Sequence, residues 1–244
     1  MTYCVAIRLD SGMLFASDSR TNAGVDHIMT FSKMHVYERA DDRVIVILSS
    51  GNLAITQGVV NTINRQQHAA DGARTIWSVD SMYDVAEIAG TTLRDVQSRD
   101  GNVLEQSGIH ASAELIVGGQ VRGEEPRLFH VYRQGNFIES SPETTYFQLG
   151  EFKYGKPILD RVLTPGTPHS EAAKCVLISF DSTLRSNISV GLPIDILWYP
   201  KDALRVAVRH TIHEGDAYWT KLRGTWGGGL RRVFMHMDNP DWLQ

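Results

Sequence analysis

The sequence predicts an α+β fold in which two antiparallel sheets stack face to face, with a pair of helices on the outer face of each. Segments of strand character come first, followed by two helical segments, more strands, two further helical segments and a last group of strands. This order is not the strand–helix alternation that builds a parallel sheet. Turn residues between successive strands, as at 134–136 and 141–142, indicate antiparallel pairing.

Composition and charge exclude several classes of protein. The 244 residues, 42% apolar and 21% charged, suit one globular domain with a large core. A net charge of -4 gives no reason to expect a nucleic-acid partner. No apolar run reaches the roughly 20 residues of a membrane span, and Arg8 and Asp10 interrupt any secretory signal. Two cysteines, Cys4 and Cys175, are too few for a disulfide framework, so we expect a cytoplasmic protein.

The first element in chain order is a predicted hairpin. Two strand-like segments flank the turn Asp10-Ser11-Gly12, and a three-residue connection containing glycine is typical of a β-hairpin. Pairing these strands brings Asp18, at the end of the second, beside Thr2, at the start of the first. The next strand-like segment, residues 31–37, can bring the ammonium group of Lys33 to the same end.

Thr2 becomes a reactive N-terminus if Met1 is removed, and a small second residue favours that removal. It then carries a hydroxyl group and a free α-amino group on adjacent carbons. The amine has a reference pKa of about 7.7–8.0 and can take the hydroxyl proton at neutral pH. A lysine beside the hydroxyl lowers the hydroxyl's effective pKa, and a carboxylate orients the lysine and balances its charge. Lys33 and Asp18 are the candidates for these two roles.

The spacing of four features resembles that of proteasome β-type subunits, which are N-terminal-nucleophile hydrolases, and matches the bacterial Anbu (ancestral β-subunit) branch best. These features are Thr2, the segment Ala16-Ser17-Asp18-Ser19-Arg20, the pair Ala23-Gly24, and Lys33. The resemblance implies a four-layer αββα sandwich of two antiparallel sheets flanked by helix pairs. It covers roughly residues 2–210, although only the first part of the chain carries specific motifs.

Gly51 is a candidate for stabilising negative charge in the reaction. The apolar run 43–48 is typical of a buried strand, and Ile55, Val59 and Ile63 recur at the spacing of one helix face. A strand that leads through a small turn into a helix aims backbone N–H groups at one point, which suits an oxyanion. In proteasome-like subunits a glycine here lines the oxyanion hole, and Gly51 is the matching residue. The alternative is a glycine that only permits a tight turn.

The remaining elements follow from similar signals. An apolar stripe predicts a helix over 82–96, capped by Ser81 and ended by residues 100–102. A second helical pair covers 154–163 and a longer helix that opens with Thr167 as its N-cap. Further strand-like segments lie at 113–117, 127–133, 137–139, 146–149, 193–199 and 204–210.

Two positions depart from the family pattern. Glu151 stands where proteasome β subunits have a serine that contacts the amine of the nucleophile. Ser189 keeps the serine of a second family element, whereas Ser186 replaces its acidic residue. A buried carboxylate near a free amine would keep the amine protonated and make it a poorer base.

The resemblance also assigns substrate-binding positions. The residues that match positions shaping the specificity pocket are Thr21, Phe31, His35, Ser49 and Leu53. Asn22 lies where the family binds the substrate backbone in the manner of an added β-strand.

The C-terminal segment differs from the rest of the chain. We expect one hydrolase domain over 1–216 and an arm over 217–244, which contains three tryptophans, three consecutive glycines and an arginine pair. Aromatic residues and arginine favour protein interfaces, so we expect the arm to pack on its own domain or on a neighbouring subunit; a flexible linker is the alternative. His210 and His213 lack a third ligand with recognisable spacing, so neither a metal nor another cofactor is expected.

Three functional hypotheses remain open. The first is a threonine peptidase or amidase that acts through Thr2, with Asp18, Lys33, Gly51, Ser189 and Glu151 around it. The second is a non-proteolytic amidase of the same superfamily, and the third is an assembly subunit with a vestigial site. The resemblance implies a homo-oligomer, either a ring or an open spiral, with a peptide or amide substrate; an unfoldase partner is left open.

Overall fold

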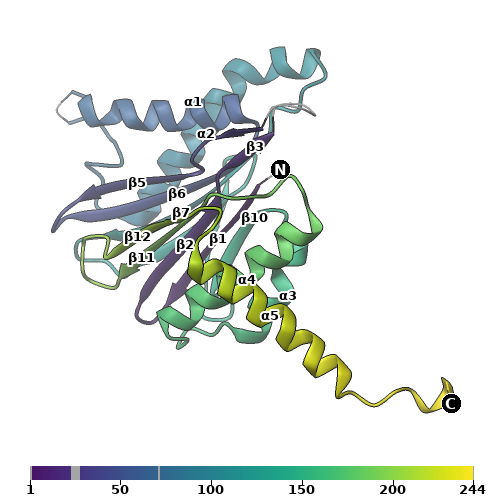
Figure 1. Ribbon diagram of the computed structural model, residues 1–244. Coiled ribbons are helices and arrows are strands. Elements are labelled where there is room, and N and C mark those ends of the chain that lie inside the picture. The colour runs from purple at the N-terminus through teal and green to yellow at the C-terminus, as the bar shows by residue number, and fades with distance from the viewer. Residues whose placement is uncertain (1, 23–27, 71, 244) are drawn as a thin grey trace.

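The computed structural model describes residues 2–22, 28–70 and 72–243 and contains two five-stranded antiparallel sheets (Figure 1). The first sheet has the order β10 (Tyr146–Gly150), β1 (Tyr3–Leu9), β2 (Gly12–Asp18), β11 (Ile194–Pro200) and β12 (Val208–Ile212). The second has the order β5 (Met34–Arg39), β6 (Arg43–Gly51), β7 (Ala113–Val121), β8 (Arg127–Val131) and β9 (Phe137–Glu139). A short ribbon pairs β3 (Arg20–Asn22) with β4 (Ile28–Thr30).

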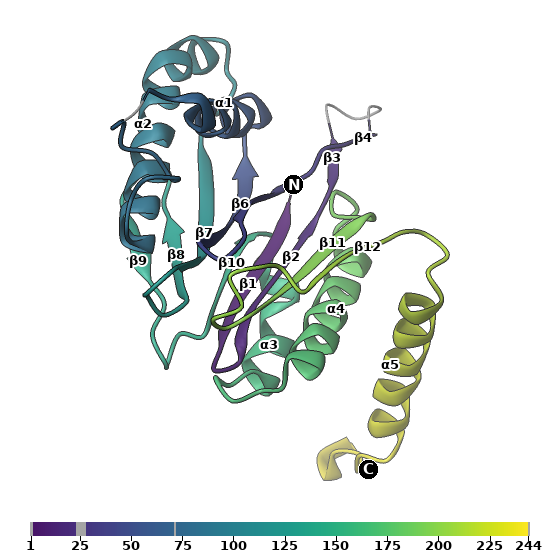
Figure 2. The same cartoon turned by 90° about the vertical axis from the view of Figure 1, so that its left-hand side faces the viewer.

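Helices cover the outer face of each sheet. Helices α1 (Leu53–Arg65) and α2 (Met82–Gln106) pack on the second sheet, and α3 (Lys156–Val162) and α4 (His169–Ser186) pack on the first. Three single 3-10 turns are η1 (Gln66–His68), η2 (Phe152–Tyr154) and η3 (Asp241–Leu243). Figure 2 shows the helix–sheet–sheet–helix order from one side. The predicted four-layer αββα sandwich is therefore confirmed.

Strand β1 shows why the sheets stack. Its side chains alternate between two buried environments: Cys4 and Ala6 face the second sheet, whereas Tyr3 and Val5 face the helices. All four side chains are fully buried. Apolar burial of this kind stabilises the fold by about 25 cal/mol per Å². A strand with apolar residues on both faces can only lie at the centre of a layered structure, and β1 lies between β10 and β2.

Two predicted helix boundaries are wrong. Helix α2 does not end at residues 100–102 but continues to Gln106, because Gly101 is buried and faces the Cβ atom of Ala111. Helix α4 begins at His169, and the Thr167 hydroxyl instead bonds the carbonyl oxygen of Val162 in the preceding turn. The Ser81 cap of α2 is confirmed, since its side chain accepts from the backbone N–H of Asp84.

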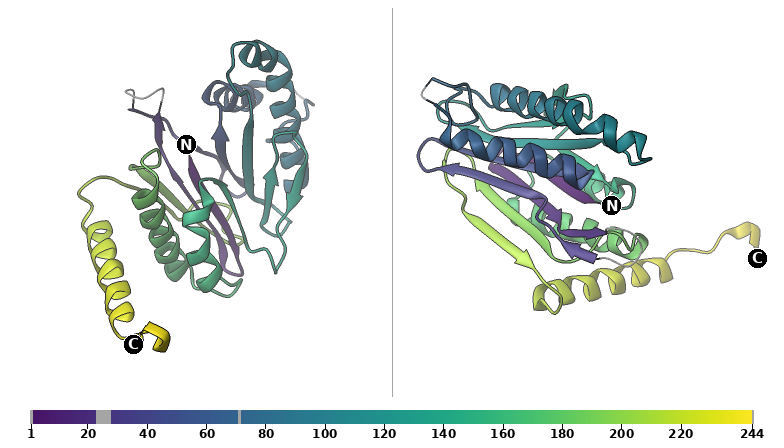
Figure 3. Two further views of the ribbon diagram at one scale, coloured as in Figure 1. Left: turned by 90° about the vertical axis from the view of Figure 1, so that its right-hand side faces the viewer. Right: turned by 90° about the horizontal axis from the view of Figure 1, so that it is seen from above.

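The C-terminal segment is mostly helical. Helix α5 (Ala217–Met235) runs straight through the three glycines, so the flexible-linker alternative is wrong. Trp219 is buried in the apolar cluster beneath α4, and the Arg223 guanidinium lies 2.6 Å from the Asp181 carboxylate. Figure 3 shows α5 beside α4, with the end of the chain extending away from the domain. None of the helices in the described ranges combines the length and apolarity needed to cross a membrane.

Candidate active site

The first hairpin places Thr2 beside Asp18. Cys4 pairs with Ser17, and the backbone N–H of Tyr3 donates to Asp18 Oδ1 at 2.9 Å. On the other side, the carbonyl oxygen of Thr2 accepts from the N–H of Glu151 at 2.8 Å. Neighbouring strands therefore hold the start of the chain from both sides, as the hairpin pattern predicts for Asp18.

The Tyr3 side chain strengthens this attachment. It is fully buried, its ring lies 4.6 Å from that of Phe180, and its hydroxyl accepts from Gln148 Nε2 at 2.7 Å. The same hydroxyl lies 3.0 Å from Ser179 Oγ on α4. Burial raises the pKa of Tyr3 far above its ordinary value, so this network stays neutral.

Lys33 forms a buried ion pair at this end of the sheet. Its ammonium nitrogen lies 2.7 Å from Asp18 Oδ1 and 2.6 Å from the carbonyl oxygen of Arg20. Because Asp18 Oδ1 also accepts from Tyr3 N–H, the ammonium group lies beside the peptide unit that follows Thr2. Burial raises the pKa of Asp18, and the Lys33 charge opposes that rise.

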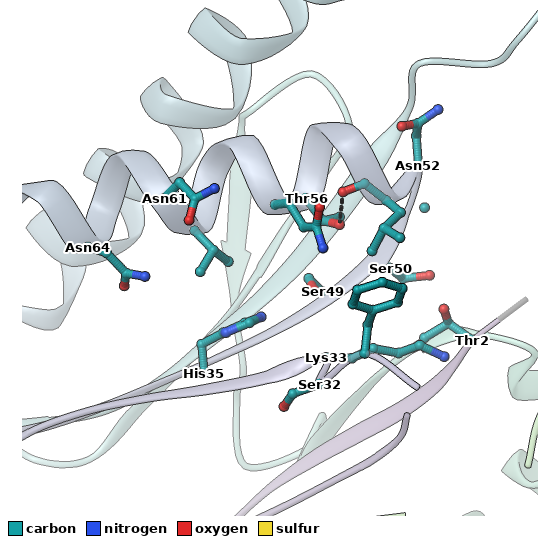
Figure 4. A pocket seen from close by; sticks show the side chains of 15 residues that line it. Thr2, Ser32, Lys33, His35, Ser49, Ser50, Asn52, Thr56, Asn61 and Asn64 are labelled. Atoms are coloured by element: carbon teal, nitrogen blue, oxygen red, sulfur yellow. Dashed lines mark hydrogen bonds between the residues drawn. The ribbon is translucent and has the colours of Figure 1, made fainter. Parts of the chain in front are cut away.

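A cavity of about 680 Å³ opens above this pair, between α1 and β5 (Figure 4). Figure 4 shows Thr2 and Lys33 together at one end, below the N-terminus of α1. Most of the sequence-predicted site residues line this single cavity: Thr2, Phe31, Lys33, His35, Ser49, Gly51 and Leu53. For Thr21 and Asn22 the structure describes only the backbone, which forms strand β3.

Gly51 meets a strict backbone requirement. Its φ of +116° is one that side chains rarely allow, and a Cβ atom there would overlap the carbonyl oxygen of Ser112. The helix that follows is already capped, because Asn52 Oδ1 accepts from the N–H groups of Ala54 at 3.0 Å and Ile55 at 3.3 Å. The helix N-terminus therefore has fewer free N–H groups for a substrate than the sequence suggests. The backbone N–H of Gly51 is left as the main candidate to contact an oxyanion.

Glu151 and Ser189 lie near the site but are not among the described residues that line the cavity. The side chain of Glu151 is 14% exposed, and its nearest described cation is Lys153, at 3.6 Å. Ser189 lies in the turn after α4, where its N–H donates to Asn187 Oδ1. That turn approaches the site through Arg20, which donates to the Ile188 carbonyl oxygen at 3.2 Å.

Sequence reasoning missed every cavity residue on helix α1 beyond Leu53, including three with side-chain amides. Gln57, Asn61 and Asn64 line the cavity at helical spacing. The apolar face of this helix was read from Ile55, Val59 and Ile63, and the amides recur on the adjoining face. Their i, i+4, i+7 spacing was visible in the sequence, but spacing alone could not predict that these side chains line a cavity.

Cys4 is close to the site but belongs to the core. Its sulfur lies 3.8 Å from the carbonyl oxygen of Ser49, and burial raises the pKa of the thiol well above its ordinary value. Within the described ranges, no three His, Cys, Asp or Glu side chains gather closely enough to hold a metal ion. His210 instead faces Asp216 at 3.7 Å.

Comparison with solved structures assigns the chain to a family. The structure of Anbu (ancestral beta-subunit) from Yersinia bercovieri is 48% identical and superposes with a TM-score of 0.92, covering 98% of this chain and 99% of the other. The chain belongs to the Anbu family. No family model matches the chain, and no curated protein does.

Two further Anbu structures agree with this assignment. Anbu from Hyphomicrobium sp. strain MC1 is 44% identical, with a TM-score of 0.92 and coverage of 98% of this chain and all of the other. The helical assembly of the Anbu complex from Pseudomonas aeruginosa contains a chain that is 45% identical, with a TM-score of 0.92 and 98% coverage of both chains. The predicted Anbu resemblance and its proteasome-β-like fold are confirmed.

Proposed function

We propose that this Anbu-family chain is an N-terminal threonine hydrolase that cleaves peptide or amide bonds through an acyl-enzyme on Thr2, after removal of Met1. The observation that carries the proposal is the Lys33–Asp18 pair, buried next to Thr2 at the end of a cavity. A buried cation beside a terminal hydroxyl is the arrangement that lowers the energy of an alkoxide.

In the acylation step, the free α-amine of Thr2 takes the proton from Oγ1 while Oγ1 attacks the substrate carbonyl carbon. The C=O electron pair moves onto oxygen, and the N–H of Gly51 stabilises the resulting oxyanion. The ammonium group of Thr2 then returns the proton to the leaving nitrogen as the C–N bond breaks. An ester on Thr2 Oγ1 and a free amine remain.

In the deacylation step, the same amine takes a proton from water, and the hydroxide attacks the ester carbonyl. Collapse of this second intermediate breaks the bond to Oγ1, which regains the proton, and releases a carboxylic acid. Lys33 keeps its proton in both steps and stabilises negative charge on Oγ1, while Asp18 holds it in place.

The remaining predicted residues receive supporting roles in this proposal. Ser189 orients the α-amine from the turn after α4, and Glu151, beside Thr2, raises the pKa of that amine. The backbone of Thr21 and Asn22 in β3 pairs with the substrate backbone. Phe31, His35, Ser49 and Leu53 contact the substrate side chain; these four line the cavity.

The decisive experiment is labelling with a peptide epoxyketone, which reacts with both the hydroxyl and the amine of a terminal threonine. We expect the wild-type protein to lack Met1 and to gain one probe mass on the peptide that begins with Thr2. The Thr2→Ala variant should gain none, whereas Thr62→Ala, on the exposed face of α1, should label normally. Both are read by intact and peptide mass spectrometry.

The alternative outcomes separate the competing functions. If the probe also labels the Thr2→Ala variant, Thr2 is excluded as the nucleophile. A trimmed wild-type protein that labels but cleaves no peptide would favour the non-proteolytic amidase. A protein that retains Met1 and gains no label would favour an assembly subunit with a vestigial site.

We further propose that the chain works in a homo-oligomer, with its C-terminal arm (217–244) on a neighbouring copy. The helical assembly of the Pseudomonas aeruginosa relative supports an oligomer. Beyond Arg223, α5 leaves large apolar side chains in solvent, including Val233 at 63% and Phe234 at 72% exposure. Such an unpartnered apolar stripe is typical of an interface.

Placing charge on this stripe is expected to weaken the assembly. The double variant Val233→Asp/Phe234→Asp should shift the molar mass measured by light scattering toward that of a single chain, because each carboxylate would be buried without a partner. Thr225→Asp, an exposed polar position on the same helix, should leave the mass unchanged. An unchanged mass for the double variant would exclude the arm from the interface.

A further inference from the structure

The cavity beside Thr2 is a long groove rather than a round pocket. Its lining follows α1 from Leu53 to Asn64, which at 1.5 Å per residue corresponds to about 16 Å. His35 faces α1 from strand β5, and Figure 4 shows it away from the Thr2 end, below Asn61. A substrate side chain that enters beside Thr2 therefore extends along α1.

Three side-chain amides, those of Gln57, Asn61 and Asn64, line this groove. None of the three side-chain amides forms a hydrogen bond with the part of the chain that the structure describes. Asn52 and Thr56 also line the groove but are engaged, because Asn52 caps α1 and the Thr56 hydroxyl donates to the Leu53 carbonyl oxygen at 3.0 Å. Donors and acceptors thus remain available along the groove beyond its Thr2 end.

The groove has little charge to offer a substrate. None of the described lining residues is acidic, and the Lys33 ammonium is already bonded to Asp18 and to the Arg20 carbonyl oxygen. Burial lowers the pKa of His35, with a further contribution from the positive charge of Arg209, so its imidazole is neutral at pH 7. A charged side chain would give up part of its hydration here with no oppositely charged residue among the described lining to pair with, other than Lys33, which already pairs with Asp18, and this costs free energy.

We propose that, given the hydrolase function proposed above, this groove selects substrates whose side chain next to the scissile bond is long, polar and uncharged, as in glutamine. A carboxamide offers both a donor and an acceptor, and so does each free amide on α1. Gln57 lies about one helical turn beyond Leu53 and is the first amide that such a side chain reaches.

The test compares four peptide epoxyketones that differ only in the side chain next to the reactive group: glutamine, leucine, glutamate and lysine. We expect the glutamine probe to label wild-type Thr2 at least tenfold faster than the glutamate and lysine probes, and faster than the leucine probe. The Gln57→Glu variant changes the charge of the side chain at nearly constant shape. In this variant, the lysine probe should label Thr2 about tenfold faster than it labels the wild type, and the glutamine probe should label it more slowly. Gln67→Glu, an exposed position outside the groove, is the matched control.

A binding measurement keeps this proposal separate from the catalytic one. The Thr2→Ala variant is titrated with fluorescent, unreactive peptides that carry the same four side chains. If Thr2→Ala binds the glutamine peptide best but no probe labels the wild-type protein, the hydrolase proposal would be overturned and the selectivity of the groove supported. Equal binding of all four peptides, or a preference for leucine, glutamate or lysine, would overturn the groove proposal.

Discussion

Replacing Lys33 with methionine is expected to slow epoxyketone labelling of Thr2 by about 10²–10³-fold, the range typical of losing one group that stabilises developing negative charge. Methionine keeps much of the length and packing of lysine but removes the cation that we propose stabilises negative charge on Oγ1. Labelling rates are compared by mass spectrometry. Lys201→Met, at an exposed lysine far along the chain, is the control for a lost positive charge.

The stability of the same variant should depend more strongly on pH than that of the wild type. Burial raises the pKa of Asp18, and Lys33 is the strongest influence that lowers it. Without Lys33, the folded-state pKa moves further above the unfolded value, so the folded state binds the proton more tightly. Stability is then greatest below the ordinary aspartate pKa and is lost as pH rises through the raised value.

Thermal unfolding between pH 5 and pH 8 measures this loss against the wild type. Adding Asp18→Asn to Lys33→Met should abolish the additional pH dependence, because no carboxyl remains, but should not restore labelling. If the Lys33→Met variant is labelled at the wild-type rate, the lysine stabilises the fold and does not assist the reaction.

Gly150→Ala is expected to displace Thr2 and to slow labelling by about 10²-fold, since a 1 Å misplacement of a reacting group can cost that much. Gly150 has φ of +79° and lies directly opposite Tyr3 in the sheet. A Cβ atom there would overlap the carbonyl oxygen of Thr2, so the start of β1 must move. The thermal midpoint should fall as well.

Gly123→Ala is the control that separates the effect of displacing Thr2 from the effect of backbone strain on labelling. Gly123 has a similar φ of +89°, but a Cβ atom there would meet no described atom within 4 Å. Both variants carry a left-handed strain of about 1–2 kcal/mol. Equal labelling by the two variants would show that Thr2 tolerates movement of its neighbour.

The site near Thr2 could be predicted because it depends on local rules. A hairpin with a three-residue turn fixes which strand ends meet, so Asp18 had to return to the start of the chain. The sequence placed Lys33 at the same end through the strand-like segment 31–37, of which residues from Met34 onward form β5 with Lys33 immediately before it. The layer order followed from the grouping of strands and helices, which residue type and spacing determine.

Other features depended on tertiary contacts that no local pattern contains. Helix α2 continues through Gly101, because burial of Gly101 against Ala111 offsets the low helix propensity of glycine. The Asn52 cap of α1, in contrast, was a local signal that the sequence analysis missed, since Asn is a favoured residue for that position. The three α1 amides that bond no other described group became interpretable only when the fold placed His35 opposite them across the cavity.

The first residues of most domains are poorly ordered. Here residues 3–9 form an interior strand, bonded to β2 and β10 and anchored through the Tyr3 ring and hydroxyl. Under the proposed mechanism, the entropy cost of fixing Thr2 is therefore met once, during folding, rather than in every turnover. If Thr2 acts as proposed, it needs no substrate-induced ordering, so we expect the rate of the chemical step to be insensitive to motions elsewhere in the chain.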